Sequence, residues 1–151
     1  MKFAADAMLG RLAKWLRLLG FDTSYKTDVE DNKLVRTARQ EGRLILTRDT
    51  RLAGRLREGE ALLVTDDRVK VQLTQVLDFL KMPPSSFALL SRCAVCNEVL
   101  RETGKDEVRD RVPEFVLCRE KNFRQCPSCG RVYWPGTHAR RIAQTLKSLG
   151  R

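Results

Sequence analysis

The chain has 151 residues and a formal net charge of +10, with 42% hydrophobic and 32% charged residues. This length supports one well-packed domain, or one domain with a small addition. No apolar run reaches the roughly 18 residues that a membrane-spanning helix needs. The sequence therefore argues against a protein with such a helix. Charged residues from Lys2 to Lys14 argue against a secretory signal peptide, so we expect a cytoplasmic protein.

Positive charge is concentrated toward the end of the chain. Residues 1–91 hold 16 Lys and Arg against 12 Asp and Glu, whereas residues 92–151 hold 13 against 7. A basic segment beside a nearly balanced one is typical of proteins that bind a polyanion, most often nucleic acid. The alternative is a surface charge that serves only solubility.

Short apolar segments alternate with amphipathic ones in the first part of the chain. The segments with strand character are residues 2–5, 21–25, 44–47 and 61–64. Apolar residues at helical spacing occupy residues 8–19, residues 31–41, a segment through Leu52 and Leu56, and residues 69–80. This alternation predicts the α/β class, with a central parallel sheet covered by helices on both faces.

The pair Pro83-Pro84 marks a boundary after these elements. We predict a first domain over residues 1–90, with residues 87–90 as a candidate fifth strand. The second predicted domain covers residues 91–151.

The second domain has the pattern of a ribbon followed by a helix. Residues 93–134 fit a ribbon whose charged middle, residues 101–114, is expected to be poorly structured. A final helix is predicted over about residues 138–149.

Two cysteine pairs, Cys93–Cys96 and Cys126–Cys129, have the spacing of a four-thiolate zinc site. A closed shell of four sulfurs leaves no position for water, so the expected zinc is structural. Two disulfides or four unrelated thiols are the alternatives, and a reducing compartment disfavours disulfides. Cys118 has no partner in this motif and is interpreted as a buried or spare thiol.

Aspartates stand where the predicted strands end. Asp6 follows the first strand, Asp49 the third, and Asp66 or Asp67 the fourth, while Asp31 begins the second helix. Because the carboxyl ends of parallel strands share one edge, we expect these acids to converge there around a cation. Carboxylates suit Mg²⁺ or Mn²⁺, and a pair of such ions can activate water for phosphodiester cleavage.

Each acid also has a structural interpretation. Asp31 and Asp49 suit the N-cap positions of helices, and Asp66-Asp67 suits a solvated turn. Three nearby acids are substitutes for the second position: Asp22, Asp28 and Glu30.

Basic residues near these acids are candidates for holding a phosphate backbone. The first helix carries three of them on one side, opposite its apolar stripe, and a solvated helix face is the alternative. The full candidate set is Arg11, Lys14, Arg17, Arg48, Arg140 and Arg141.

Four sequence blocks resemble the mutator-seven C-terminal RNase domain family, a branch of the PIN-like nucleases with an added zinc ribbon. The blocks are Phe3–Asp22, Leu44–Asp49, Ser91–Asn97 and Cys126–His138. The resemblance covers essentially the whole chain and implies a PIN-like three-layer α/β/α sandwich, a structural zinc ribbon and metal-dependent endoribonuclease activity. It also implies a catalytic, metal-binding role for four acids: Asp6, Asp31, Asp49 and Asp67.

Three further residues lie close to the last cysteine. Tyr133 and Trp134 could stack on unpaired bases, but we expect them to pack the ribbon against its neighbour. His138 is not expected to bind zinc, because four sulfurs complete the shell. It is expected to cap the final helix, with phosphate contact beside Arg140 and Arg141 as the alternative.

The leading hypothesis is a ribonuclease that uses Mg²⁺ or Mn²⁺ and acts on RNA. The competitor is an RNA- or ribosome-binding module that kept the fold and lost efficient chemistry. A toxin of a toxin–antitoxin pair fits PIN domains generally, but the added ribbon disfavours it. No motif in the sequence specifies an RNA target or an oligomeric state.

Overall fold

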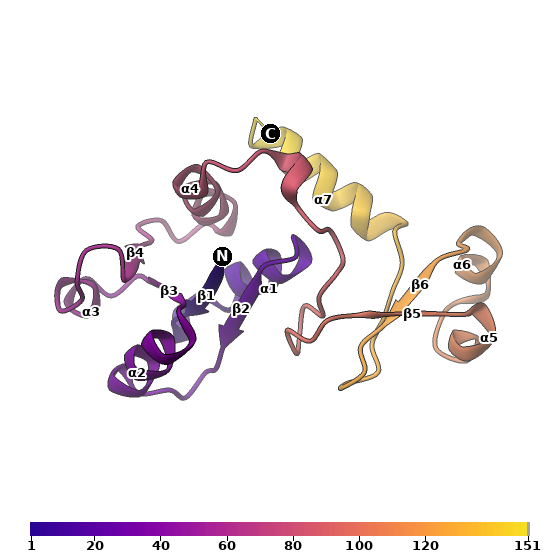
Figure 1. Cartoon of the computed structure of the whole chain (residues 1–151). Helices are drawn as coiled ribbons and strands as arrows, with labels where there is room; N and C mark the ends of the chain where they lie inside the picture. Colours follow the sequence, from indigo (N-terminus) through magenta and orange to yellow (C-terminus); the bar gives the residue numbers. More distant parts are fainter. Residues whose placement is uncertain (151) are drawn as a thin grey trace.

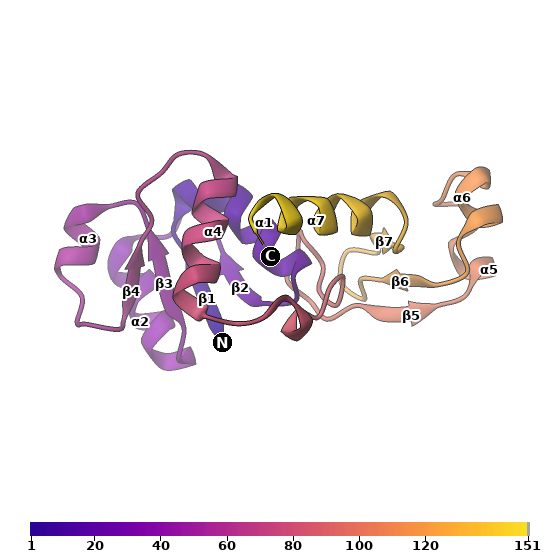
Figure 2. The same cartoon turned by 90° about the horizontal axis from the view of Figure 1, so that it is seen from above.

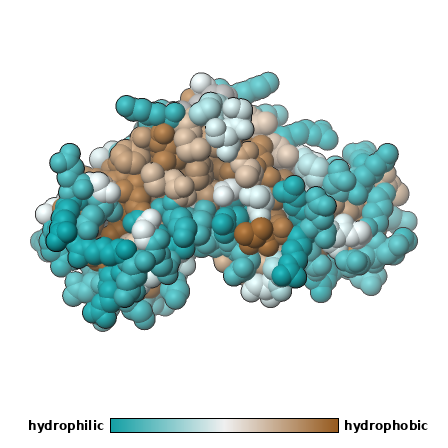
Figure 3. Space-filling model, in the orientation of Figure 1, coloured by the Kyte–Doolittle hydropathy of each residue, from teal (hydrophilic) through white to brown (hydrophobic). Residues whose placement is uncertain are grey.

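The computed structural model describes residues 1–150, and at residues 137 and 138 it describes only the backbone. An α/β part and a ribbon lie next to each other, and the last helix runs between them (Figure 1). Hydrophilic residues cover both ends of the molecule, while apolar residues gather over its middle (Figure 3).

A four-stranded parallel sheet forms the centre of the α/β part. Its strands lie in the order β2-β1-β3-β4. Their bounds are β1 Lys2–Ala5, β2 Asp22–Tyr25, β3 Leu44–Thr47 and β4 Ala61–Leu63. Since every pairing is parallel, the carboxyl ends of all four strands meet at one edge of the sheet.

Helices cover both faces of this sheet. They are η1 Ala7–Leu9, α1 Gly10–Leu18, α2 Asp31–Glu41, α3 Thr50–Gly54, α4 Val69–Leu80 and the short η2 Pro84–Ser86. On one face Phe3 packs in a cluster with Leu16 of α1 and Leu77 of α4. On the other face Ala4 packs with Ala38 of α2, because successive strand residues point to opposite faces. The predicted three-layer α/β/α sandwich is confirmed.

The ribbon is a three-stranded antiparallel sheet in the order β5-β6-β7. Its bounds are β5 Arg101–Thr103, β6 Phe123–Gln125 and β7 Val132–Tyr133, with α5 Lys105–Val108 and α6 Glu114–Arg119 between the first two strands. The prediction of a poorly structured middle was wrong. Val108, Val112 and Val116 form an apolar cluster with Phe123, which orders this segment at the far end of the ribbon.

Residues 87–90 form no strand, contrary to the prediction. The segment turns at the end of α1, where the Leu90 amide donates to the Leu18 carbonyl at 2.9 Å. Leu90 itself has a φ of 53°, which is incompatible with an extended strand.

The last helix, α7 Thr137–Ser148, agrees with the predicted one and returns to the α/β part. Its buried residues Ile142 and Leu146 belong to the same apolar cluster as Leu16 and Leu77. Figure 2 shows α7 alongside α1 and α4. The division of the chain into two domains after residue 90 stays a prediction. Helix α7 belongs to the second predicted domain but packs against the first.

Candidate functional site

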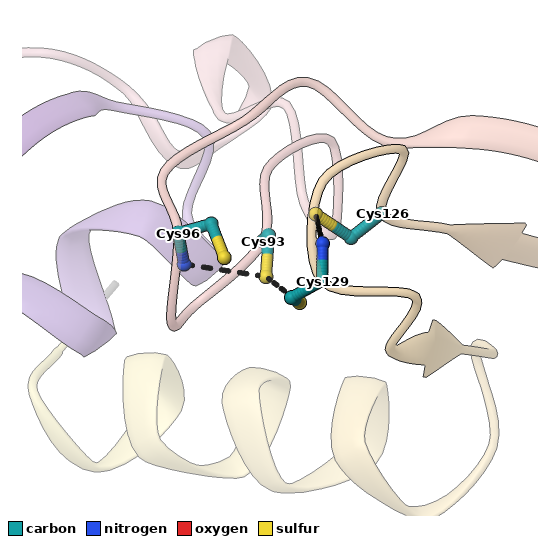
Figure 4. Close-up of side chains that lie close together, drawn as sticks. All are labelled: Cys93, Cys96, Cys126 and Cys129. Carbon is teal, nitrogen blue, oxygen red and sulfur yellow. Dashed lines mark hydrogen bonds between the residues drawn. The ribbon is translucent and has the colours of Figure 1, made fainter.

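Four cysteines converge between the ribbon and the α/β part. The sulfur atoms of Cys93, Cys96, Cys126 and Cys129 all lie within 4.8 Å of one another. Figure 4 shows the four side chains directed toward one another from two separate loops. These cysteines could hold a metal ion such as zinc.

The two loops have matching backbone geometry. In the first loop, the Asn97 amide donates to the Cys93 carbonyl at 2.9 Å, and in the second the Gly130 amide donates to the Cys126 carbonyl at 3.0 Å. Asn97 and Gly130 both have positive φ, 67° and 76°. Glycine adopts this conformation freely and asparagine tolerates it better than most residues, so both loops can turn sharply around their sulfurs.

The electrostatics of the four thiols favour a cation. Burial raises the pKa of Cys93, but hydrogen bonds from Tyr133 and from backbone amides lower it to about 7. The hydrogen bond with Cys129, burial and the neighbouring thiolates raise the pKa of Cys96 to about 12. The thiols therefore resist ionising together unless a positive ion lies between them.

The sulfur spacing also fits zinc. A tetrahedral ion with Zn–S bonds of about 2.3 Å separates its sulfurs by about 3.8 Å. The Cys93 and Cys129 sulfurs are 3.7 Å apart.

Aromatic residues support this cluster from the ribbon. The Tyr133 hydroxyl lies 3.2 Å from the Cys93 sulfur and accepts a 3.0 Å hydrogen bond from the Ala94 amide. Trp134 packs against Phe123, with ring centroids 6.3 Å apart. Tyr133 also packs against the apolar cluster of the α/β part, as expected, whereas Trp134 packs within the cluster of the ribbon itself.

Two of the candidate acids are connected at the carboxyl edge of the parallel sheet. Asp6 follows β1 and Asp49 follows β3, which are neighbouring strands. The buried Thr47 hydroxyl donates to Asp6 Oδ2 at 2.9 Å and accepts from the Asp49 amide at 3.0 Å. One side chain at the end of β3 therefore binds both acidic residues.

Local hydrogen bonds hold each of these carboxylates. Asp6 Oδ1 accepts from the Ala7 amide at 2.6 Å. Asp49 Oδ1 accepts from the amides of Arg51 and Leu52, so Asp49 is the N-cap of α3, as its structural interpretation anticipated. Within the described contacts, Asp49 Oδ2 accepts no hydrogen bond.

The other candidate acids lie near the same edge with different partners. Asp31 is the first residue of α2, whose N-cap is Glu30, so the interpretation of Asp31 as an N-cap was wrong. Its carboxylate forms a 3.4 Å ion pair with Arg55. Asp66 accepts three hydrogen bonds from Arg68, two of them from the guanidinium, and these bonds lower its pKa. Asp67 is exposed.

The aspartates do not enclose an ion by themselves. Among the described side chains, the four cysteines are the only group of three or more metal-binding residues whose ligand atoms all lie within 4.8 Å of one another. Any divalent ion at the sheet edge would need ligands beyond this chain, such as water or a substrate.

The basic candidates differ in their exposure. Arg11 and Lys14 are exposed on α1, Arg140 and Arg141 are exposed on α7, and Arg48 is partly buried. The prediction was wrong for Arg17, which is only 5% exposed and donates to backbone carbonyls of β2 and of the first cysteine loop. Helical spacing alone could not reveal the loop that covers it.

Thr47 is the site residue that the sequence analysis missed. Its signal is a hydroxyl at the last position of a wholly apolar strand, two residues before an aspartate. Cys118 is exposed on α6, so of its two interpretations the buried thiol was wrong. The side chain of His138 lies outside the described part of the chain, and its role stays a prediction.

No helix in residues 1–150 is long and apolar enough to cross a membrane. The compartment predicted from the sequence stays a prediction.

Comparison with known proteins gives one match. The model of the Mut7-C RNAse domain family matches residues 1–146. No curated protein and no solved structure matches the chain. The matched region contains the parallel sheet, the aspartates at its carboxyl edge and both cysteine loops. The chain therefore belongs to the Mut7-C RNAse domain family.

Proposed function

We propose that this protein is a metal-dependent endoribonuclease that hydrolyses RNA phosphodiester bonds. Membership of an RNase domain family supports the nuclease class. The observation that carries the mechanism is the Thr47 hydroxyl, which connects Asp6 and Asp49 at the carboxyl edge of the sheet. This is the edge at which open parallel sheets bind their ligands.

Asp6 and Asp49 are the proposed principal ligands of a divalent ion, with Asp31 and Asp67 completing the acidic set. Mg²⁺ usually keeps several waters and binds through one or two carboxylates together with substrate phosphates. An open pair of carboxylates fits this preference better than a closed cage does. When bound, Mg²⁺ or Mn²⁺ supplies an activated water and neutralises the charge that develops on the phosphate.

The chain's own residues would hold the acids in place. Thr47 and the Ala7 amide bind both oxygens of Asp6, and the cap of α3 binds one oxygen of Asp49, leaving the other for the ion. Because the Asp66 carboxylate already forms an ion pair with Arg68, Asp67 is the better candidate for the fourth acid. The exposed Asp31–Arg55 pair is weak enough to open when a cation or substrate arrives.

Exposed basic residues would bind the RNA backbone. Helices α1 and α7 contribute to one apolar cluster. The first carries the exposed Arg11 and Lys14, and the second carries the exposed Arg140 and Arg141. The cysteine site is proposed to hold structural zinc that keeps the ribbon folded. A closed four-sulfur shell has no open position for catalysis.

The test is divalent-dependent cleavage of RNA by the variants Asp6→Asn and Asp49→Asn. In Asp49→Asn the amide oxygen can still accept from both α3 amides. Asp6→Asn keeps an acceptor for Thr47 and loses the one for the Ala7 amide, so it should be slightly less stable, and both variants should fold and keep their zinc. Loss of the ligand charge should lower the cleavage rate by at least about 100-fold.

The matched control is Asp106→Asn, on α5, where the side chain is 92% exposed. It should cleave RNA at the wild-type rate. Full activity in the two edge variants would refute the proposed site. Tight RNA binding with no turnover by the wild type would select a binding module instead.

A further inference from the structure

The first cysteine loop covers the outer edge of strand β2. This strand lies at the end of the sheet, so one row of its backbone groups has no neighbouring strand to bind. The Thr23 amide donates to Asn97 Oδ1 at 3.0 Å, and the Thr23 carbonyl accepts from Arg17 Nε at 2.9 Å. Side chains from α1 and from the loop thus take the place of a missing strand.

Arg17 joins the same strand to the cysteine loop. Its Nη1 donates to the carbonyls of Ala94 and Val95, the two residues between Cys93 and Cys96, at 3.0 and 2.9 Å. The residue is 5% exposed. All three acceptors are neutral carbonyls, so these contacts alone do not compensate for burying a full positive charge.

When a Zn²⁺ is bound, the four cysteines would supply the missing negative charge. Four thiolates around one Zn²⁺ leave an excess of about two negative charges. Cys93 and Cys96 flank the carbonyls that Arg17 binds, and their charges, with that of Asp22, oppose the lowering of the Arg17 pKa by burial. The buried guanidinium and the partly buried cysteine cluster therefore share one short loop.

Asn97 adds a second connection. Its amide nitrogen donates to Asp22 Oδ1 at 2.8 Å, while its oxygen accepts from Thr23. Asp22 also accepts from Arg43 at 2.6 Å, and Arg92 lies 4.0 Å from its other oxygen. The residue that turns the first loop is thus bound to the first two residues of β2.

We propose that Arg17 is the buried counter-charge of the metal–thiolate site and that, with Asn97, it couples metal binding by the ribbon to the edge strand β2 of the nuclease sheet. This inference concerns positioning and does not depend on whether the protein cleaves RNA. It predicts that metal loading protects residues far from the cysteines in the sequence.

The first experiment measures zinc affinity by competition with a chelator, using the full-length zinc-loaded chain. Arg17→Gln should weaken zinc binding by about 10–100-fold, the range seen when residues supporting metal ligands are replaced. Arg17→Lys keeps the charge but cannot reach all three carbonyls. Its zinc affinity should therefore lie between that of Arg17→Gln and that of the wild type. Lys14→Gln, exposed on the same helix, should bind zinc like the wild type.

The second experiment measures hydrogen exchange with and without zinc. Removing zinc should speed exchange in the peptides that cover residues 22–25 and 94–97, and leave residues 44–47 of the inner strand β3 unchanged. Asn97→Gly, which keeps the left-handed backbone, should make exchange at Thr23 independent of zinc. This variant also tests the coupling if the Arg17 variants fail to fold.

Two results would overturn the inference. One is equal zinc affinity in Arg17→Gln and Lys14→Gln. The other is exchange at Thr23 that does not respond to zinc in the wild type.

Discussion

Thr47 shows how much a single side chain can organise at the sheet edge. Its hydroxyl is fully buried, donates to one candidate acid and accepts from the amide of the next. Its sequence signal, a hydroxyl two residues before an aspartate, does not by itself separate a packing threonine from a positioning one. The role became visible only when β1 and β3 were placed side by side.

Thr47→Val tests this role. Valine has nearly the same shape, so the substitution removes two hydrogen bonds, and we expect a loss of about 1–2 kcal/mol in the free energy of unfolding. Misplacement of Asp6 should also slow RNA cleavage by about tenfold or more. Chemical denaturation and a cleavage assay measure the two effects.

The control for this substitution is Thr74→Val on α4. The Thr74 hydroxyl donates only to the Lys70 carbonyl of its own helix. Its stability should stay within about 0.5 kcal/mol of wild type, with unchanged cleavage. Equal effects in both variants would contradict a special role for Thr47.

The contact between the Asp22 carboxylate of the sheet and Asn97 of the first cysteine loop is expected to be sensitive to acid. Burial raises the pKa of Asp22, but hydrogen bonds from Arg43 and Asn97 outweigh burial and leave the pKa below the ordinary value. A carboxyl of this kind stabilises the fold above its unfolded-state pKa of about 3.9. That contribution disappears as the pH falls through the lower, folded-state pKa.

Thermal unfolding of wild type and Asp22→Asn as a function of pH measures this effect. The wild type should be the more stable protein near neutral pH, and the difference in Tm should shrink as the pH falls from about 5 to about 3. A difference that stays constant over this range would show that the Asp22 charge does not hold the contact.

At the scale of elements, local periodicity predicted the sheet and its helices well. The predicted strands 2–5 and 44–47 coincide with β1 and β3, because a short apolar run between turn residues leaves few alternatives. The errors arose where ordering depends on a distant partner. The segment 101–114 is ordered by Phe123, which lies outside it in the sequence.

The same limit applies to the candidate site. Aspartates after parallel strands could be predicted, because topology alone brings strand ends to one edge. The burial of Arg17 could not, since it depends on a loop more than seventy residues away in the chain.

The turn between α1 and β2 allows a matched pair of glycine substitutions. Gly20 has a φ of 97°, and an added Cβ would lie 2.5 Å from the Ala88 carbonyl oxygen. Gly20→Ala should therefore cost at least about 1–3 kcal/mol in the free energy of unfolding from backbone strain alone. It should also displace the linker that leads to the cysteine loop.

Gly54→Ala is the matching control, because no atom lies within 4 Å of the added Cβ and α3 ends there. It should be neutral or stabilise the protein by up to about 1 kcal/mol. Denaturant unfolding of both variants measures the difference. Comparable stability of the two would show that the Gly20 turn relaxes without strain.

For the whole molecule, the ribbon and α7 are joined to the α/β part by direct contacts. The first cysteine loop covers β2, and α7 returns to the cluster of α1 and α4. The surface is hollowed between the α/β part and the ribbon, on the lower side in Figure 3. The basic residues Arg140 and Arg141 therefore lie on a helix that packs against the α/β part, and not on a separate tail.

The salt dependence of RNA binding tests the contribution of this charge. Replacing Arg140 and Arg141 by Gln should reduce the slope of log affinity against log salt by about 1.4, since each phosphate contact to a single strand contributes about 0.7. Arg36→Gln, exposed on α2, should leave the slope unchanged. A slope unaffected by the double substitution would exclude α7 from the RNA-binding surface.

In the proposed reaction, aspartates at the sheet edge use a divalent ion to direct water onto an RNA phosphodiester. The most direct measurement is the chemistry of the product ends, with zinc-loaded wild type incubated with RNA in Mn²⁺, in Mg²⁺ or in EDTA. Metal-activated water leaves one phosphate and one hydroxyl end and also cuts at a 2′-deoxy position, because the 2′-hydroxyl takes no part. We predict such products with a divalent ion and none in EDTA. Cleavage that persists in EDTA and leaves 2′,3′-cyclic phosphates, or no cleavage under any ion, would contradict the account.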